Sequence, residues 1–98
     1  MLSRIEDEFE LLERHVKILR LVLKNEPVGI IKLSELSQIP QHKVRYSLRM
    51  LEQSDIIKPS PQGAVTTTKA HKFMENLPKE LQILKEKIKK TQKLAKIP

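Results

Sequence analysis

The segment from Ile30 to Thr67 most constrains the fold of this chain, because two helical patterns and two β-prone runs follow one another there at short intervals. Apolar residues recur at helical spacing before Pro40 and again after it, so a proline-marked turn separates two short helices. Ile56–Lys58 and Ala64–Thr67 are β-prone, and the residues between them have the composition of a turn. The segment predicts a helix, a turn, a second helix and a small β-hairpin.

Helices are expected on both sides of this segment. Apolar residues repeat at spacings of three and four over residues 1–25, a region without Gly or Pro, which predicts one long helix that ends before Pro27. After the hairpin, Thr67 or Thr68 can cap a helix, and Pro78 can open a last helix with Leu81, Leu84 and Ile88 facing inward. The predicted fold is α+β, mostly α, in a single domain over residues 1–98, made of segments 1–25, 29–67 and 68–98.

The helix predicted over residues 40–53 carries the best candidate site. Val44, Leu48 and Leu51 form its inward stripe, and Ser47 between them permits close packing. The opposite face follows from the rotation of 100° per residue. It has His42, Tyr46, Arg49 and Gln53 at its centre, with Gln41, Lys43 and Arg45 on its flanks. Cations and amides therefore outnumber apolar groups on the outward face.

Several short motifs follow one another along the chain in an order that is found in a known protein family. Leu33-Ser34 and Ile39 lie in the first helix and turn, Val44 lies in the second helix, and Arg49-Met50-Leu51-Glu52 precedes Ile56-Ile57 and Thr67-Thr68-Lys69-Ala70. Over about residues 12–77 this order resembles the winged helix-turn-helix transcriptional regulators of bacteria and archaea. Gln38 and Asp55 stand where that family usually has Gly, so both are expected to adopt a left-handed or adjusted backbone.

The resemblance implies binding to double-stranded DNA, with helix 40–53 in the major groove and the hairpin as a wing. Arg45 and Arg49 are then expected to contact guanine, Gln41 to contact adenine, and Tyr46 to contact a sugar or phosphate. The full set of predicted DNA-binding residues is Gln41, His42, Lys43, Arg45, Tyr46, Arg49, Lys58 and Gln62.

The apolar stripe on the first helix is longer than a domain of this size can cover by itself, which predicts a homodimer. The first helix, the last helix or both can form the interface. Two copies would place their recognition helices about 34 Å apart, to read a palindromic operator. The predicted interface residues are Leu2, Ile5, Phe9, Leu12, Leu81, Leu84 and Ile88.

The charge distribution favours an anionic partner. The chain carries a formal charge of +7, which steers it toward nucleic acid. Residues 1–13 hold one Arg and five acidic residues, whereas residues 79–98 hold seven Lys and two Glu. The Lys-rich end has no interleaved aromatic residue for stacking on single strands. It is therefore interpreted as the solvated, charge-balancing face of a dimer helix and not as a second nucleic-acid site.

Other functions find less support. His15, His42 and His71 show no metal-ligand spacing, cysteine is absent, and no glycine-rich phosphate loop or catalytic motif occurs, so we expect no metal, no cofactor and no enzymatic activity. Neither a signal-peptide pattern nor an apolar run of about 18 residues is found, which favours a cytoplasmic protein. The main alternative to DNA binding is a protein-docking adaptor, because a fold does not determine a function. RNA binding is a weaker alternative, because aromatic residues are few. The sequence does not show whether a small-molecule effector binds.

Overall fold

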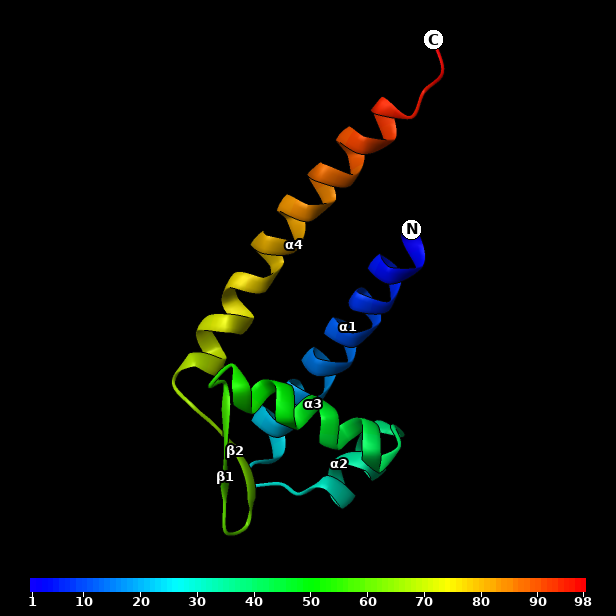
Figure 1. The fold of residues 1–98 in the computed structure, drawn as a ribbon. Coiled ribbons are helices and arrows are strands. Elements are labelled where there is room, and N and C mark those ends of the chain that lie inside the picture. Colours follow the sequence, from blue (N-terminus) through cyan, green and yellow to red (C-terminus); the bar gives the residue numbers. More distant parts are fainter.

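The computed structural model describes all residues 1–98 and has four helices and one β-hairpin (Figure 1). The class is α+β and mostly helical, as predicted. The elements follow the chain in the order α1 Leu2–Asn25, α2 Ile30–Ser37, α3 Gln41–Gln53, β1 Ile57–Ser60, β2 Gly63–Thr66 and α4 Lys69–Leu94. The prediction that the first helix ends before Pro27 is confirmed.

One apolar cluster holds the first five elements together. The C-terminal half of α1, α2, α3 and the hairpin all contribute buried side chains to it, whereas α4 contributes only Ala70 at its start. The inward stripe predicted for α3 is confirmed, because Val44, Leu48 and Leu51 are buried and Ser47 is fully buried beside them. The buried apolar residues are Ile18, Leu19, Val22, Val28, Leu33, Val44, Leu48, Leu51, Ile56, Ile57, Ala64 and Ala70.

The turn between α2 and α3 contains a residue with a left-handed backbone conformation, Gln38. Gln38 has a φ of 61° and donates its backbone N–H to the Ser34 carbonyl, and the Ser34 hydroxyl donates to the Ile39 carbonyl at 2.6 Å. The expected left-handed backbone at Gln38 is therefore confirmed, as it is at Asp55, where φ is 62°. Helix α3 begins at Gln41, one residue later than predicted, with Pro40 as its N-cap. The Pro40 carbonyl accepts the N–H of Val44.

The hairpin is longer than predicted, because β1 continues through Pro59 to Ser60. Pro59 lies opposite Ala64, whose N–H and carbonyl both bond to Val28 on the other side of β2, at 2.8 and 3.1 Å. The Pro59–Ala64 pair therefore needs no hydrogen bond, and the missing proline N–H costs nothing. Only residues 61 and 62 remain in the turn.

Residues 26–28 add a third extended segment beside β2. Val28 bonds to Ala64 as described, and the Glu26 carboxylate accepts the backbone N–H and the hydroxyl of Thr66 at 2.8 and 2.9 Å. Gly63 has a φ of 131°, and a Cβ there would lie 2.5 Å from the carbonyl carbon of Val28. Close approach of the two segments therefore requires glycine at position 63.

The prediction of two C-terminal helices is wrong, because α4 is a single helix with Pro78 inside it. A proline at this place removes one helical hydrogen bond. Pro78 is exposed, and α4 continues through it as one helix. At the start of α4 the Thr67 hydroxyl oxygen accepts the N–H of Lys69 at 3.2 Å, which confirms one of the two predicted caps.

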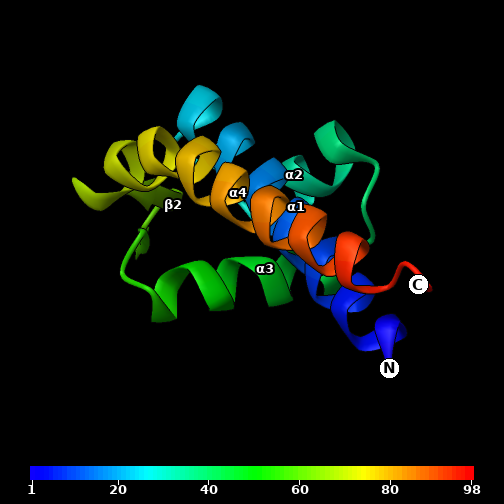
Figure 2. The ribbon, with the colours of Figure 1, turned by 90° about the horizontal axis from the view of Figure 1, so that it is seen from above.

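The first half of α1 and the second half of α4 project from the packed core in the same direction, so both chain ends lie at one end of the molecule (Figures 1 and 2). The radius of gyration is 16.2 Å, compared with about 13 Å for a compact chain of this length. No helix combines the length and the apolar character needed to cross a membrane.

Candidate nucleic-acid interface

The buried side of helix α3 fixes the helix against the rest of the domain. Its four buried residues pack against α1, α2 and the hairpin, and Ser47 also makes a hydrogen bond to α1, with 2.8 Å between its Oγ and Nδ1 of His15. No buried side-chain polar atom in the structure lacks a partner. The helix is thus positioned by both packing and a specific polar contact, which leaves its opposite face with a defined orientation.

The opposite face of α3 is open to solvent, as predicted. Arg45 and Arg49 are exposed, and neither takes part in an ion pair. The two ion pairs of the structure join Lys69 to Asp55 and Lys89 to Glu86, away from this face. The guanidinium groups of α3 are therefore free to bind an external anion. The other exposed residues of this face are Gln41, His42, Lys43 and Gln53.

Gln41 and Arg45 lie on the flank of α3 that is turned toward α2. Together with Lys32 and Glu35 they line a shallow groove between the two helices. Lys32 adds a cation to the candidate interface that the pattern on α3 alone did not indicate. Its acidic neighbour Glu35 is exposed and makes no ion pair with it.

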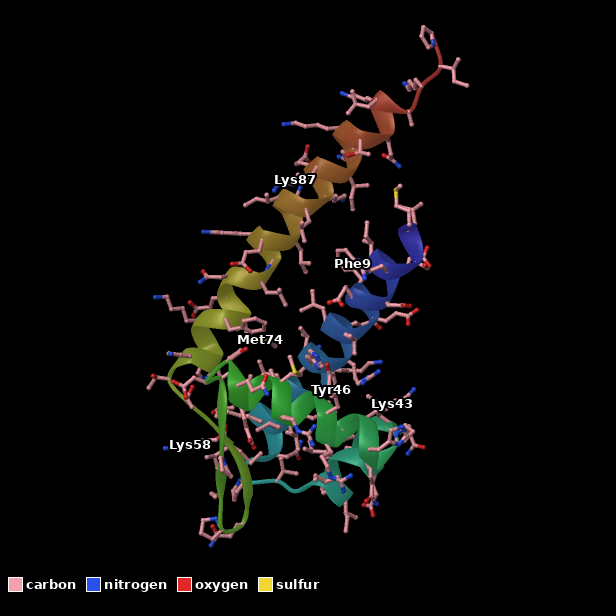
Figure 3. All side chains as sticks on the ribbon, viewed as in Figure 1. Phe9, Lys43, Tyr46, Lys58, Met74 and Lys87 are labelled. Carbon is pink, nitrogen blue, oxygen red and sulfur yellow. The ribbon has the colours of Figure 1, made fainter.

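Tyr46 lies on the other flank of α3, where it meets α1 (Figure 3). Its ring centroid is 5.9 Å from that of His15 with a tilt of 40°, and 39% of its surface is exposed. The helical rotation predicts Tyr46 at the centre of the outward face. In the structure Tyr46 lies at the edge of that face, because its ring packs on α1 while part of the ring stays accessible.

The hairpin presents a second, smaller polar surface. Lys58 is exposed on β1 and extends away from the core (Figure 3). Gln62 is exposed at the tip, and the Ser60 hydroxyl closes the turn by donating to the Gly63 carbonyl at 2.6 Å. In Figure 3, Lys58 lies at the left edge of the view on the hairpin and Lys43 at the right edge on α3.

His15, which shows no metal-ligand spacing in the sequence, lies at the contact between α1 and α3. Its partial burial lowers the pKa of the imidazole, the charge of Arg14 acts in the same direction, and Glu8 opposes them. The neutral ring is thus favoured where it contacts Ser47 and Tyr46. The contact joins residues 32 positions apart. Ser47, a polar residue in the middle of the buried stripe of α3, is the feature of the sequence that indicates a polar partner such as His15.

The residues predicted to form a dimer interface lie on the projecting halves of α1 and α4. Leu12 is partly buried, whereas the others are exposed: Leu2, Ile5, Phe9, Leu81, Leu84 and Ile88. Leu81, Leu84 and Ile88 are not buried in the core as expected, because α4 leaves the core after its first turns. Leu81 and Leu84 line grooves together with residues of α1 and stay 36% and 40% exposed.

No group of three or more His, Cys, Asp or Glu side chains lies close enough together to hold a metal ion. Comparison of the chain with protein-family models and with curated protein sequences found no match. Function is therefore inferred from the arrangement of side chains described above.

Proposed function

We propose that this protein is a sequence-specific, double-stranded DNA-binding transcriptional regulator of the winged helix-turn-helix type. The observation that carries the proposal is the outward face of α3, where Arg45 and Arg49 are exposed and unpaired on a helix fixed by its buried side. An exposed helix of this kind fits the major groove of B-DNA, and Arg forms two hydrogen bonds to guanine there.

The remaining residues support the same mode of binding. Gln41 at the start of α3 is suited to adenine, while Lys43, His42 and the accessible edge of Tyr46 are suited to phosphates and sugars. The hairpin would act as the wing, with Lys58 on the adjacent backbone and Gln62 at the tip. The left-handed turns at Gln38 and Asp55 and the added segment at Val28 support the assignment to this fold.

We further propose that the regulator binds DNA as a homodimer. The exposed apolar residues of α1 and α4 form a surface whose exposure to water is unfavourable. A second subunit would cover this surface. Two subunits would present two α3 helices to a palindromic site with half-sites about 34 Å apart.

The test is selection from a library of random duplexes, followed by measurement of binding to the enriched sequence over a range of salt concentrations. We expect a clear consensus and a steep loss of affinity with salt, because Lys and Arg displace counterions from the phosphates. Failure to enrich any sequence would contradict the proposal. Such a result, together with capture of a defined protein partner through α3, would favour the docking adaptor instead.

Variants on α3 assign the contacts. Arg45→Ala and Arg49→Ala should each weaken binding to the selected duplex by about 1–3 kcal/mol and relax the preference at one position. Lys72→Ala on the exposed start of α4 is the matched control, because it removes the same charge outside α3 and the hairpin. Equal losses in all three variants would show that only the net charge matters, and would contradict base reading by the two arginines.

A further inference from the structure

An apolar surface without a partner lies between α1 and α4. Two adjoining grooves run along it, one lined by Phe9, Leu12, Val16, Leu77 and Leu81, and the next by Ile5, Phe9, Leu12 and Leu84. The first has a volume of about 470 Å³, and Phe9 lies on the side of α1 that is turned toward α4 (Figure 3). An apolar surface of this length on two projecting helices is typical of a protein interface.

The charges beside these grooves are unevenly divided along each helix. Residues 2–13 of α1, here called the α1 arm, carry one Arg and five acidic residues, a net charge of −4. Residues 14–25 carry four cations and no acidic residue, so the base of the same helix has a net charge of +4 with His15 neutral. Residues 81–94 of α4, here called the α4 arm, carry five Lys and one Glu, a net charge of +4.

We propose that a second copy of the chain covers this surface in one particular alignment, with the two-fold axis running along the arms. The acidic α1 arm of each subunit then packs beside the basic α4 arm of its partner. The inverted alignment, with the arms pointing in opposite directions, would place the basic α4 arm against the equally basic base of α1. Charge therefore selects between two alignments that the apolar grooves alone would allow.

The selected alignment also has a consequence for DNA. Both α3 helices lie at the same end of the dimer, as a palindromic duplex requires, whereas the inverted alignment would place them at opposite ends. This inference rests on the proposed function only for that consequence. The pairing of the arms stands on the exposed apolar residues and on the opposite charges of the two tips.

The residues that flank the apolar stripes are the ones to change. Glu6 and Glu8 lie on either side of the line through Ile5 and Phe9, and Lys85 and Lys87 lie on either side of the line through Leu84 and Ile88. All four are exposed, and none of them makes an ion pair in the single chain. Their substitution leaves the packed core untouched.

The experiment compares two charge-reversed chains by sedimentation equilibrium. Glu6→Lys with Glu8→Lys raises the net charge of the α1 arm from −4 to 0 and leaves the α4 arm at +4, whereas Lys85→Glu with Lys87→Glu lowers the net charge of the α4 arm from +4 to 0 and leaves the α1 arm at −4. Each chain alone should dimerise at least about 10-fold more weakly than the natural chain. Mixed together they should form a 1:1 heterodimer that is tighter than either homodimer, because one contact pairs the unaltered arms of −4 and +4 and the other brings the new lysines beside the new glutamates. Glu35→Lys with Glu52→Lys, outside the arms, is the matched control and should dimerise normally.

The possible outcomes separate the alternatives. A natural chain that stays monomeric, or charge reversals that leave dimerisation unchanged, would overturn the proposal. Recovery only when all four substitutions are combined in one chain, with no recovery on mixing, would show that the arms pair within a subunit and would also overturn it. Selection of a duplex by a chain that remains monomeric would refute the dimer and leave DNA reading by α3 intact. Dimerisation as described without selection of any duplex would do the reverse.

Discussion

The packed core and the two arms contain the same kinds of apolar residue but use them differently. Leu19 in the core half of α1 is fully buried, whereas Leu84 on the α4 arm is 40% exposed. Both belong to stripes at helical spacing. The difference is that the core half of α1 packs against α2, α3 and the hairpin, while the α4 arm contributes no residue to the buried core. An apolar stripe therefore predicts that a surface will be covered, but not which molecule covers it.

The largest expected effect tests this contrast directly. Leu19→Ala should lower the free energy of unfolding by about 2–5 kcal/mol, because it removes a fully buried side chain and leaves a cavity. Leu84→Ala should change it by less than about 1 kcal/mol in a dilute, monomeric sample. Urea unfolding followed by circular dichroism measures both. Similar losses from the two substitutions would mean that the α4 arm is packed within the single chain.

Gly63→Ala addresses the contact between the hairpin and the segment before α2. The new methyl group would collide with the Val28 backbone at a φ that suits only glycine, so we expect a loss of about 1–3 kcal/mol in stability. Gly29→Ser is the control, because a Cβ there has no neighbour within 4 Å and Ser is a good N-cap for α2. Urea unfolding of both variants is the measurement, and equal losses would show that the close approach at Gly63 is unimportant.

A substitution that should increase stability is Gln38→Gly. Gln38 caps the C-terminus of α2 with a φ of 61°, and glycine adopts that conformation without the steric cost of a Cβ. We expect the free energy of unfolding to rise by about 0.5–1 kcal/mol. The substitution also removes the hydrogen bond from the Gln38 side chain to the Glu35 carbonyl, which offsets part of the gain. The same change at Gln53, within α3, should destabilise. Thermal unfolding distinguishes the two, and a loss at Gln38 would show that its side-chain bond outweighs the backbone strain.

The smallest effect concerns pH and the contact between α1 and α3. The pKa of His15 is lowered from its ordinary value of 6.5 in the folded chain, so the unfolded chain binds more protons as the pH falls past that value. The contribution of His15 to stability is thus complete above pH 6.5, and it decreases as the pH falls through the lowered pKa of the folded state. His15→Gln should flatten this part of the stability profile. His71→Gln, at an exposed position on α4, should leave it unchanged, and a profile that is the same in both variants would contradict the role of His15.

Local signals in the chain determined most of the secondary structure. Pro27 marks the end of the first helix, the spacing of Val44, Leu48 and Leu51 defines the buried side of α3, and the outward cations follow from that spacing. Both features depend on backbone geometry within a few residues, which is why the sequence alone was sufficient. The left-handed backbone at Gln38 and Asp55, by contrast, was expected from the resemblance to a family that usually has Gly at those positions.

The tertiary structure decided the features that depend on residues far apart. Pro59 can lie within β1 because Val28 takes the hydrogen bonds of Ala64 on the other side, and Ser47 can be buried because His15 reaches it from α1. In each case the deciding partner is distant in sequence, so no local pattern contains it.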